Sequence, residues 1–380
     1  MKEGSGRVSL TAAPTSRQRG VEEGRPILVV AEEVDDLPDE GYDRFSTELA
    51  AALVRRRQVL VHFTPQIGSH RSLVAKVVAR LGRAWRAARQ PDVRRLRPAV
   101  VLYMSVHPAT VPALLRAALL RRVAGAPVAM MIIQPNSFSA LGRWLLKVVP
   151  PDLLLVGTDP ECQEARRLGV NSGVIWSGVD TERFRPPEAG EKEELRRRYG
   201  LPVGDQIVMH VGHLRESRNL RALVPLAATP GVTVVVVASR RTWPETEDLR
   251  RELEAQGVRV LDGYQPRIEE LYRLADCYVF PCTEADHAIA LPLSVVEAIG
   301  SGLPVVAMRF RALPERLSAM PGVELVDTSD ELPGRVLAVL RSPGDTRPLA
   351  AALSWDSVAE LVCEMLEGLE TPRRPAVSTR

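Results

Sequence analysis

The stretch IVMHVG, residues 207–212, decides the fold class of this 380-residue chain. It is a short apolar run that ends on a glycine, and a helical pattern follows it over residues 219–228. The next run, VTVVVVA at residues 232–238, is again apolar and rich in β-branched side chains. A buried strand, a glycine-ended loop, a helix and another buried strand form the repeating unit of a parallel sheet covered by helices.

The same alternation extends in both directions from this stretch. Upstream, we expect strands at residues 26–31, 59–63, 99–104, 127–133, 152–157 and 173–176. Helical patterns lie between these strands, among them those at residues 45–57, 71–89 and 111–123. Downstream, we expect helices at residues 245–256, 268–275 and 292–300, and strands at 258–261, 277–281 and 304–308. The pattern predicts an α/β protein with two doubly wound, Rossmann-like domains in tandem.

A proline-rich break, RPPEAG at residues 185–190, separates the two series of strands. We therefore place one domain at residues 26–187 and the other at residues 188–350. Residues 1–25 and 370–380 carry scattered polar residues and no apolar core, so we expect them to be disordered tails. Ligands of doubly wound sheets bind at the carboxyl ends of the strands, which predicts an interdomain cleft.

Charge and cysteine content exclude several classes of protein. The chain carries 50 basic and 47 acidic side chains, whereas a dedicated nucleic-acid binder usually has a clear basic excess. Its four cysteines form no CxxC pair and lack the spacing of zinc ligands, so we expect reduced thiols. No apolar run reaches the roughly 18 residues of a membrane span. These features predict a cytoplasmic protein.

The loop after residues 207–212 reads GHLRESRN, and Arg218 stands just before the expected helix start. The N-terminus of a helix presents free N–H groups and a positive dipole, so Arg218 there is suited to hold a diphosphate. An ordinary strand-to-helix loop with no ligand is an equally good interpretation of this loop by itself.

Glu297 is a carboxylate within the apolar helical stretch LPLSVVEA, residues 291–298. A buried glutamate is costly unless it meets a hydrogen-bond donor, and a ribose diol is a suitable partner. The sequence GSGLPVV at residues 300–306 then ends the helix with glycines and begins another buried strand.

Four segments together resemble the retaining glycosyltransferases of family 4, which have the GT-B fold. SGVDTERF at 177–184 is similar to N-G-V-D-x-x-x-F, and VGHLRESRNL at 211–220 is similar to V-G-R-L-x-x-x-K-N. LPLSVVEAIGSGLPVV at 291–306 resembles E-G-L-P-x-x-x-x-E-A-x-x-S-G-x-P-V-V. The fourth, Ser354-Trp355, matches the approach to a last helix, at 351–369, which in that fold returns to the first domain.

The resemblance implies a role for each matching residue. Glu297 matches the ribose-binding glutamate and Arg218 the lysine that contacts the donor phosphates, and we take both as catalytic candidates. It implies a UDP- or GDP-sugar as the donor, with no tightly bound cofactor and no catalytic metal. The donor-binding set is Gly41, Gly212, His213, Arg218, Tyr264, Gln265, Ala290, Leu291, Pro292, Leu293 and Glu297.

Several positions depart from the family pattern. Ile289 and Ala290 stand where the family has a glutamate near the donor sugar and a glycine. His213 replaces the phosphate-binding arginine of V-G-R-L, and Gln134 is the nearest match to a frequent histidine. Arg311-Ala312 stands where the family has a pair of glycines before a Pro-Glu sequence. These departures indicate an unusual donor sugar.

Candidates on the acceptor side are His107 and Gln134, each of which follows a predicted strand of the first domain. A loop histidine with no ligand is the simpler interpretation of His107. The segment Glu284-Ala285-Asp286-His287 contains groups that bind metals, but no D-x-D motif ends a strand, and we expect no metal there.

The predicted helix at residues 71–89 has valine and leucine on one face and six Lys or Arg residues on the other. This pattern fits a helix on an anionic bilayer surface, in which case the acceptor is a lipid or lipid-linked glycan at the inner membrane. A helix that buries one face against its own sheet explains the pattern more simply, and we favour this interpretation.

The leading hypothesis is a glycosyltransferase that moves a sugar from a nucleotide-diphosphate sugar to a hydroxyl of a glycan, lipid or small molecule, with retention. One alternative is a scaffold or binding protein that kept the fold and lost transfer, which the changes at Ile289, His213 and Gln134 motivate. Another is a different GT-B enzyme, such as a sugar-nucleotide epimerase.

Overall fold

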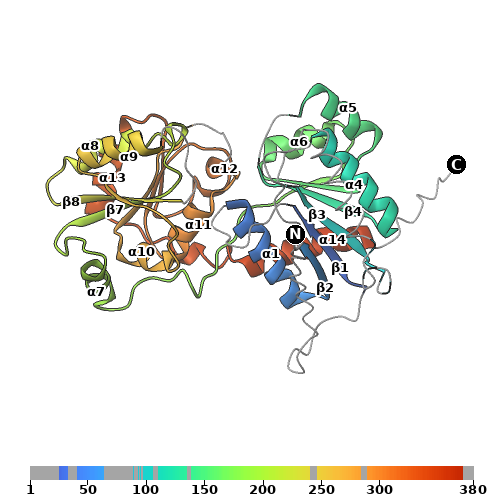
Figure 1. Cartoon of the computed structure of the whole chain (residues 1–380), viewed down its shortest axis with the longest axis horizontal. Helices are drawn as coiled ribbons and strands as arrows, with labels where there is room; N and C mark the ends of the chain where they lie inside the picture. The colour runs from blue at the N-terminus through green and yellow to red at the C-terminus, as the bar shows by residue number, and fades with distance from the viewer. Residues whose placement is uncertain are drawn as a thin grey trace, which may run out of the picture. The chain divides into compact units, whose positions relative to one another are not determined.

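The computed structural model describes residues 25–32, 41–63, 97–105, 110–134, 138–239, 246–283 and 289–370, and the single residues 89, 93 and 95. The chain divides into two compact units (Figure 1). It leaves the first unit between Trp176 and Ser177, and it returns to that unit between Ser357 and Val358. From the sequence, we expected these two crossings at 187/188 and 350/351.

The first unit contains a parallel sheet of six strands in the order β2-β1-β3-β4-β5-β6. The strands are β1 (Ile27–Ala31), β2 (Val59–Phe63), β3 (Val100–Ser105), β4 (Val128–Ile132), β5 (Leu153–Val156) and β6 (Ser172–Val174). The helices are α1 (Gly41–Arg56), α4 (Val111–Ala124), α5 (Ala140–Val148) and α6 (Asp159–Arg167). Strands β1, β3, β4 and β5 are buried along their whole length, because helices cover both faces of a sheet of this kind.

Helix α14 (Trp355–Glu370) joins the first unit from Val358 onward. Ion pairs link it to the end of α1, with Arg57 Nη1 lying 2.8 Å from Glu370 Oε1 and Arg56 Nη2 lying 3.3 Å from Glu360 Oε2. The helix therefore completes a unit whose other elements all come before Trp176 in the sequence.

The second unit contains another parallel sheet of six strands, in the order β12-β11-β10-β7-β8-β9. The strands are β7 (Gln206–Gly212), β8 (Val232–Ala238), β9 (Arg259–Leu261), β10 (Cys277–Phe280), β11 (Val305–Met308) and β12 (Val323–Val326). The helices are α7 (Glu191–Arg198), α8 (Val224–Ala227), α9 (Thr246–Ala255), α10 (Ile268–Leu274), α11 (Leu293–Gly300), α12 (Leu313–Leu317) and α13 (Glu331–Arg341). The prediction of two doubly wound α/β sheets is confirmed.

The strand order reverses between β7 and β10 of the second unit. From β7 the chain adds β8 and β9 on one side, and it then crosses to the other side to form β10, β11 and β12. The segments that leave the carboxyl ends of β7 and β10 therefore diverge from neighbouring strands, the arrangement at which doubly wound sheets bind their ligands.

The predicted helix at residues 219–228 is wrong in its first half. Short 3₁₀ turns at Glu216–Arg218 and Leu220–Leu223 precede α8, which is only four residues long. Asn219 has a φ of 53°, in the left-handed region, so a right-handed helix cannot include it. Its side-chain amide donates to the carbonyl of Pro281 at 3.0 Å and to Ser329 Oγ at 2.9 Å, and these bonds hold the turn.

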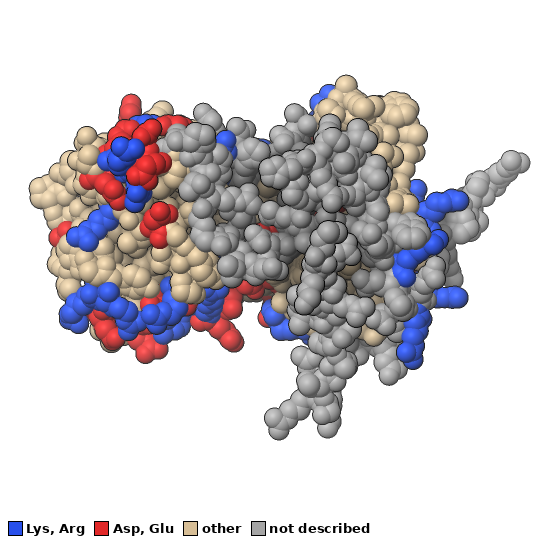
Figure 2. All heavy atoms as spheres, in the orientation of Figure 1, with Lys and Arg blue, Asp and Glu red and all other residues tan. Residues whose placement is uncertain are grey.

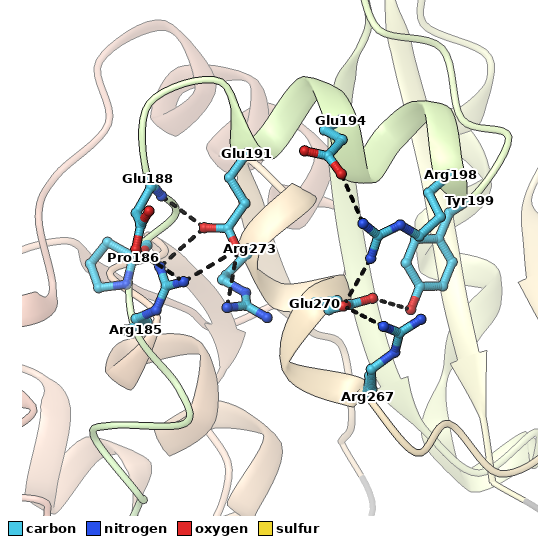
Figure 3. Close-up of polar contacts among 10 residues, drawn as sticks. All are labelled: Arg185, Pro186, Glu188, Glu191, Glu194, Arg198, Tyr199, Arg267, Glu270 and Arg273. Atoms are coloured by element: carbon cyan, nitrogen blue, oxygen red, sulfur yellow. Dashed lines mark hydrogen bonds and ion pairs between the residues drawn. The ribbon is translucent and has the colours of Figure 1, made fainter.

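The proline-rich stretch at residues 185–190 is tied down by ion pairs (Figure 3). Arg185 Nη1 lies 3.0 Å from Glu191 Oε2, and Arg273 Nη1 of α10 lies 3.1 Å from Glu191 Oε1. At the C-terminal end of α7, Tyr199 donates to Glu270 Oε2 at 2.9 Å. Burial and this hydrogen bond raise the pKa of Tyr199 to about 12. The segment that the sequence suggested as a linker thus contacts α10 through α7.

None of the helices in the described parts of the chain is long and apolar enough to cross a membrane. Within the same residues, no three His, Cys, Asp or Glu side chains gather as metal ligands would. The metal-capable residues Glu284, Asp286 and His287, residues 71–88 of the basic helix, and nearly all of both expected tails lie outside the described residues.

Candidate functional site

The loop that follows β7 is built on a buried histidine. His210 points Nδ1 at the carbonyl of Val279 on β10, at 2.9 Å, so Nδ1 carries the proton and Nε2 is an acceptor. A Cβ on Gly212 would lie 2.7 Å from His210 Nε2, which explains why a glycine ends this strand. Burial, together with the smaller effect of the charges of Arg218 and His213, lowers the pKa of His210 to about 4, so the ring is neutral.

Arg218 lies in the first 3₁₀ turn after this loop and is only 7% exposed. It interacts with the thiol of Cys282. Burial raises the pKa of this thiol to about 11, and Arg218 offsets part of the effect of burial. Its Nε is buried and has no hydrogen-bond partner in the part of the chain that the structure describes. His213 lies in the same loop, with Nδ1 2.5 Å from Ser239 Oγ at the end of β8. The carboxyl ends of β7 and β8 therefore hold a buried cation and a histidine, a combination suited to an anion.

Glu297 is buried on α11, at 3% exposure, as the apolar helical stretch predicts. The hydroxyl of Tyr272 on α10 donates to Glu297 Oε2 at 2.8 Å. Sequence reasoning missed Tyr272, because a hydrogen bond between two helices 25 positions apart leaves no local pattern. A carboxylate oriented in this way is suited to accept hydrogen bonds from a diol.

The loop before α11 is held by backbone contacts. Ser177 Oγ donates to the carbonyl of Leu291 at 2.6 Å, and the Ala312 amide donates to the carbonyl of Ala290 at 3.2 Å. Pro292 is the N-cap of α11, and no side chain caps this helix end in the described residues. The first N–H groups of α11 thus face the same edge of the sheet as the β7 loop.

Ile289 is 7% exposed, and its neighbours Ala290 and Leu291 are buried as well. The wall before α11 is therefore apolar. Arg311 has a φ of 47°, which is uncommon for a residue other than glycine. It occupies the first position of the family's glycine pair, so the chain keeps the glycine-like backbone there with a larger side chain.

The segment SGVDTERF at residues 177–184 anchors other elements of the second unit. The Val179 amide donates to the carbonyl of Leu353 at 2.8 Å, and the Trp355 amide donates to the carbonyl of Val179 at 3.2 Å. A Cβ on Gly178 would lie 2.6 Å from the ring of Trp355. The first and fourth resembling segments are therefore in contact, and both position the backbone that holds Leu291.

The remaining predicted donor and acceptor residues lie in other loops. Tyr264 and Gln265 follow β9, two strands from β7, and Tyr264 is 45% exposed. Gly41 begins α1 and Gln134 follows β4, where it is partly exposed. His107 lies outside the described residues.

The first unit has its own buried polar cluster, which the sequence did not reveal. Arg116 of α4 is fully buried and lies 2.7 Å from Glu32 Oε1, just after β1. Its Nε also donates to the hydroxyl of Tyr103 at 2.8 Å. Burial and the nearby Glu32 carboxylate raise the pKa of Tyr103. Because Glu32 and Arg116 are 84 positions apart, no sequence motif joins them.

A family model described as "Glycosyl transferases group 1" matches residues 205–353, within the second unit. D-inositol 3-phosphate glycosyltransferase of Corynebacterium urealyticum is 27% identical over 248 residues, 58% of this chain and 57% of the relative. The enzyme of the same name from Acidothermus cellulolyticus is 28% identical over 233 residues, 54% of this chain and 50% of the relative. The chain thus spans about half the length of the curated relatives it matches.

Solved structures match over more of the chain. Anabaena HepE in complex with UDP superimposes with a TM-score of 0.69 at 17% identity, over 90% of this chain and 100% of that chain. Sucrose-phosphate synthase from Thermosynechococcus elongatus superimposes with a TM-score of 0.68 at 16% identity, over 91% of this chain and 99% of that chain. At these identities the likeness to solved structures establishes the fold, and the family match over residues 205–353 shows what the second unit is similar to. The chain therefore has the GT-B fold, and its second unit is similar to the group 1 glycosyl transferases.

Proposed function

We propose that this protein transfers a sugar from a nucleotide-diphosphate sugar to an acceptor hydroxyl, with retention of configuration. The observation that carries the proposal is that Arg218, beside the β7 loop, is buried and pairs with no carboxylate among the described residues. The neighbouring strand, β10, leads to Glu297. A buried cation without a carboxylate is costly, and a diphosphate would neutralise it.

In this proposal the donor diphosphate lies against the Gly212 loop and the N-terminus of α11. Arg218 and His213 stabilise the negative charge that develops as the nucleoside diphosphate leaves. The Glu297 carboxylate, oriented by Tyr272, accepts hydrogen bonds from the ribose hydroxyls. Leu291 and its neighbours present backbone groups to the sugar and phosphates, and Tyr264 and Gln265 flank the base. No residue of this set requires a metal.

We propose UDP- or GDP-sugars as donors. HepE has been solved with UDP and with UDP-glucose, which favours a uridine nucleotide. The curated relatives are named for an inositol phosphate acceptor, and a polyol hydroxyl suits the same chemistry. A glycan or lipid hydroxyl remains the other class of acceptor. His107 and Gln134 are the candidates for contact with the acceptor, and Gly41 is a candidate for contact with the donor.

A second candidate function is nucleotide-sugar binding without transfer. Its support is Ile289, a buried apolar side chain at the position where the family pattern has a glutamate near the donor sugar. Loss of that carboxylate removes a hydrogen-bond partner of the sugar, and it leaves the nucleotide contacts in place. Either function predicts the same nucleotide site, and only the first predicts release of nucleoside diphosphate.

The site is tested by calorimetric titration with UDP and GDP. We expect Glu297→Ala to weaken the affinity by about tenfold to a hundredfold, because it removes charge-assisted hydrogen bonds to the ribose. Glu254→Ala is the matched control, since Glu254 is an exposed carboxylate on α9 of the same unit. Unchanged affinity in Glu297→Ala would remove this residue from the site.

Transfer is tested by incubation with a panel of UDP- and GDP-sugars and polyol, glycan and lipid acceptors. Acceptor-dependent release of nucleoside diphosphate, with a retained anomeric configuration in the product, is the expected result. Tight nucleotide binding with no release over the whole panel would favour the binding protein. Interconversion of the nucleotide sugar with its 2-epimer would instead indicate an epimerase.

A further inference from the structure

Helix α5 is apolar on two faces. Gly142, Leu145 and Leu146 are buried against the first unit. Leu141, Trp144 and Val148 are 54%, 56% and 56% exposed, and their spacing of three and then four residues places them on one outer face. A surface helix usually places polar residues on the side that faces water, so this outer face is anomalous.

Helix α4 contacts α5 and adds to the same surface. Its Leu115 is 44% exposed. Six large apolar side chains are exposed in the part of the chain that the structure describes, and four of them lie on these two helices. We name Leu115, Leu141, Trp144 and Val148 the α4–α5 apolar face. In Figure 2 the surface over α5 is mostly tan. Clustered exposed apolar groups of this kind mark an interaction surface, whereas single ones are ordinary.

The charges around the α4–α5 apolar face are basic. The sequence has no Asp or Glu from residue 93 to residue 151, which includes both helices. Arg121 and Arg143 are partly neutralised, by Asp152 at 3.6 Å and by Glu164 at 2.8 Å. Arg122 and Lys147 are exposed, and no ion pair is found for either among the described residues. An apolar centre with a positively charged rim is therefore presented to solvent.

We propose that the α4–α5 apolar face docks on an anionic lipid bilayer. Trp144 and the neighbouring Leu and Val side chains would enter the boundary between headgroups and acyl chains, where tryptophan is favoured. Arg122 and Lys147 would remain at the level of the lipid phosphates, with their aliphatic stems against the apolar groups. The partner is thus a membrane surface that carries negatively charged headgroups.

A second copy of the chain fits this face less well. A two-fold contact would place the same patch on both partners. Arg122 and Lys147 of one copy would then face basic residues of the other, and neither α4 nor α5 offers a carboxylate to pair with them. The charge pattern therefore favours lipid phosphates over self-association.

The test is flotation of the full chain with vesicles of phosphatidylcholine alone and with about 30% phosphatidylglycerol added. We expect binding to the anionic vesicles only, and release at high salt. The double variant Leu141→Ser/Trp144→Ser should weaken binding by at least about tenfold, because it removes the apolar groups that insert. Val203→Ser is its control, since Val203 is the exposed aliphatic side chain of the second unit.

The charge contribution is tested separately. Arg122→Gln/Lys147→Gln should weaken binding to anionic vesicles by about fivefold or more per residue removed. Its control is Arg197→Gln/Arg341→Gln, which removes two exposed arginines of the second unit and should leave binding unchanged.

Three outcomes would overturn the proposal. The first is absence of binding to either vesicle. The second is binding that survives Leu141→Ser/Trp144→Ser, which would assign membrane contact to another segment. The third is a dimer of the wild-type chain, measured by light scattering, that the same variant dissociates. In support, vesicle binding should shift the tryptophan emission to the blue, and Trp144→Phe should remove most of that shift.

Discussion

The two units have sheets of the same kind, but they treat their buried arginines differently. In the first unit, Arg116 lies 2.7 Å from the carboxylate of Glu32. In the second, Arg196 lies 2.5 Å from Asp276 Oδ2 and also donates to three backbone carbonyls. Arg218 is buried too, yet it pairs with no carboxylate in the described residues. The difference sets Arg218 apart: the other two arginines are paired within the fold, whereas Arg218 is the one that we propose binds the donor diphosphate.

The largest change in stability is expected when each arginine is truncated. Arg116→Ala and Arg196→Ala should each lower the free energy of unfolding by about 3–5 kcal/mol. Arg116→Ala removes the ion pair of the buried Glu32, and Arg196→Ala removes an ion pair to the part-buried Asp276 together with three hydrogen bonds to backbone carbonyls. Arg218→Leu should leave stability unchanged or raise it, because it strands no carboxylate, and it should abolish nucleotide binding.

Thiol labelling in urea measures each unit separately. All four cysteines are free and buried, with Cys162 and Cys363 in the first unit and Cys277 and Cys282 in the second. Arg116→Ala should expose Cys162 at lower urea, and Arg196→Ala should expose Cys277. A loss of stability in Arg218→Leu as large as in Arg196→Ala would contradict the distinction drawn between them.

A somewhat smaller effect is expected from pH, and only in the second unit. The pKa of His210 is about 4 in the folded chain against 6.5 for an exposed histidine, so the folded state binds fewer protons. The free energy of unfolding therefore keeps its full value above about pH 6.5. It falls by about 3 kcal/mol in total as the pH drops toward 4, because protonation of His210 favours the unfolded chain.

Amide hydrogen exchange, analysed peptide by peptide and corrected for intrinsic exchange rates, measures this loss of stability. The β7 peptide should lose protection between pH 6.5 and pH 4 in the wild type, and His210→Phe should flatten that dependence. Phenylalanine suits the site because Tyr278 and Phe280 already pack against the ring. An equal pH dependence in His210→Phe would show that another group titrates.

Two glycines on either side of the crossing at Trp176 provide a third test. A Cβ on Gly178 would lie 2.9 Å from Trp355 Cα as well as near its ring, and backbone cannot move aside easily. A Cβ on Gly173 would meet the flexible thioether of Met365. Gly178→Ala should therefore cost about 1–3 kcal/mol in urea unfolding, and Gly173→Ala less than about 1 kcal/mol. Equal losses would mean that Trp355 gives way as readily as Met365.

The smallest changes in stability are expected from exposed ion pairs, which both units have on their surfaces. Arg221 pairs with Glu252 on the surface of the second unit, and Arg143 pairs with Glu164 on the first. All four side chains are substantially exposed, so Arg221→Gln and Arg143→Gln should each change stability by less than about 1 kcal/mol. Thermal unfolding at low and high salt measures both, and a loss above 2 kcal/mol in either would show that its surface pair matters more than exposure suggests.

Sequence patterns predicted the strands and most of the helices because burial on both faces of a sheet leaves uninterrupted apolar runs. They predicted the buried Glu297 for the same reason. They did not predict Tyr272, Glu32 with Arg116, or the Asp276 partner of Arg196, since these contacts join positions that only the tertiary fold brings together. The error at Asn219 has a different origin, because a left-handed residue held by its own side chain overrode the helical pattern.

The division of α14 has a consequence for the order in which the chain folds. The helix begins in the second unit at Trp355 and belongs to the first from Val358 onward. On the ribosome, residues 177–357 emerge as one nearly complete unit, whereas the first unit must wait for α14 to follow them. The first unit is thus synthesised earlier and completed later. Until α14 docks, the surface that it covers, including Gly173 opposite Met365, is available to chaperones.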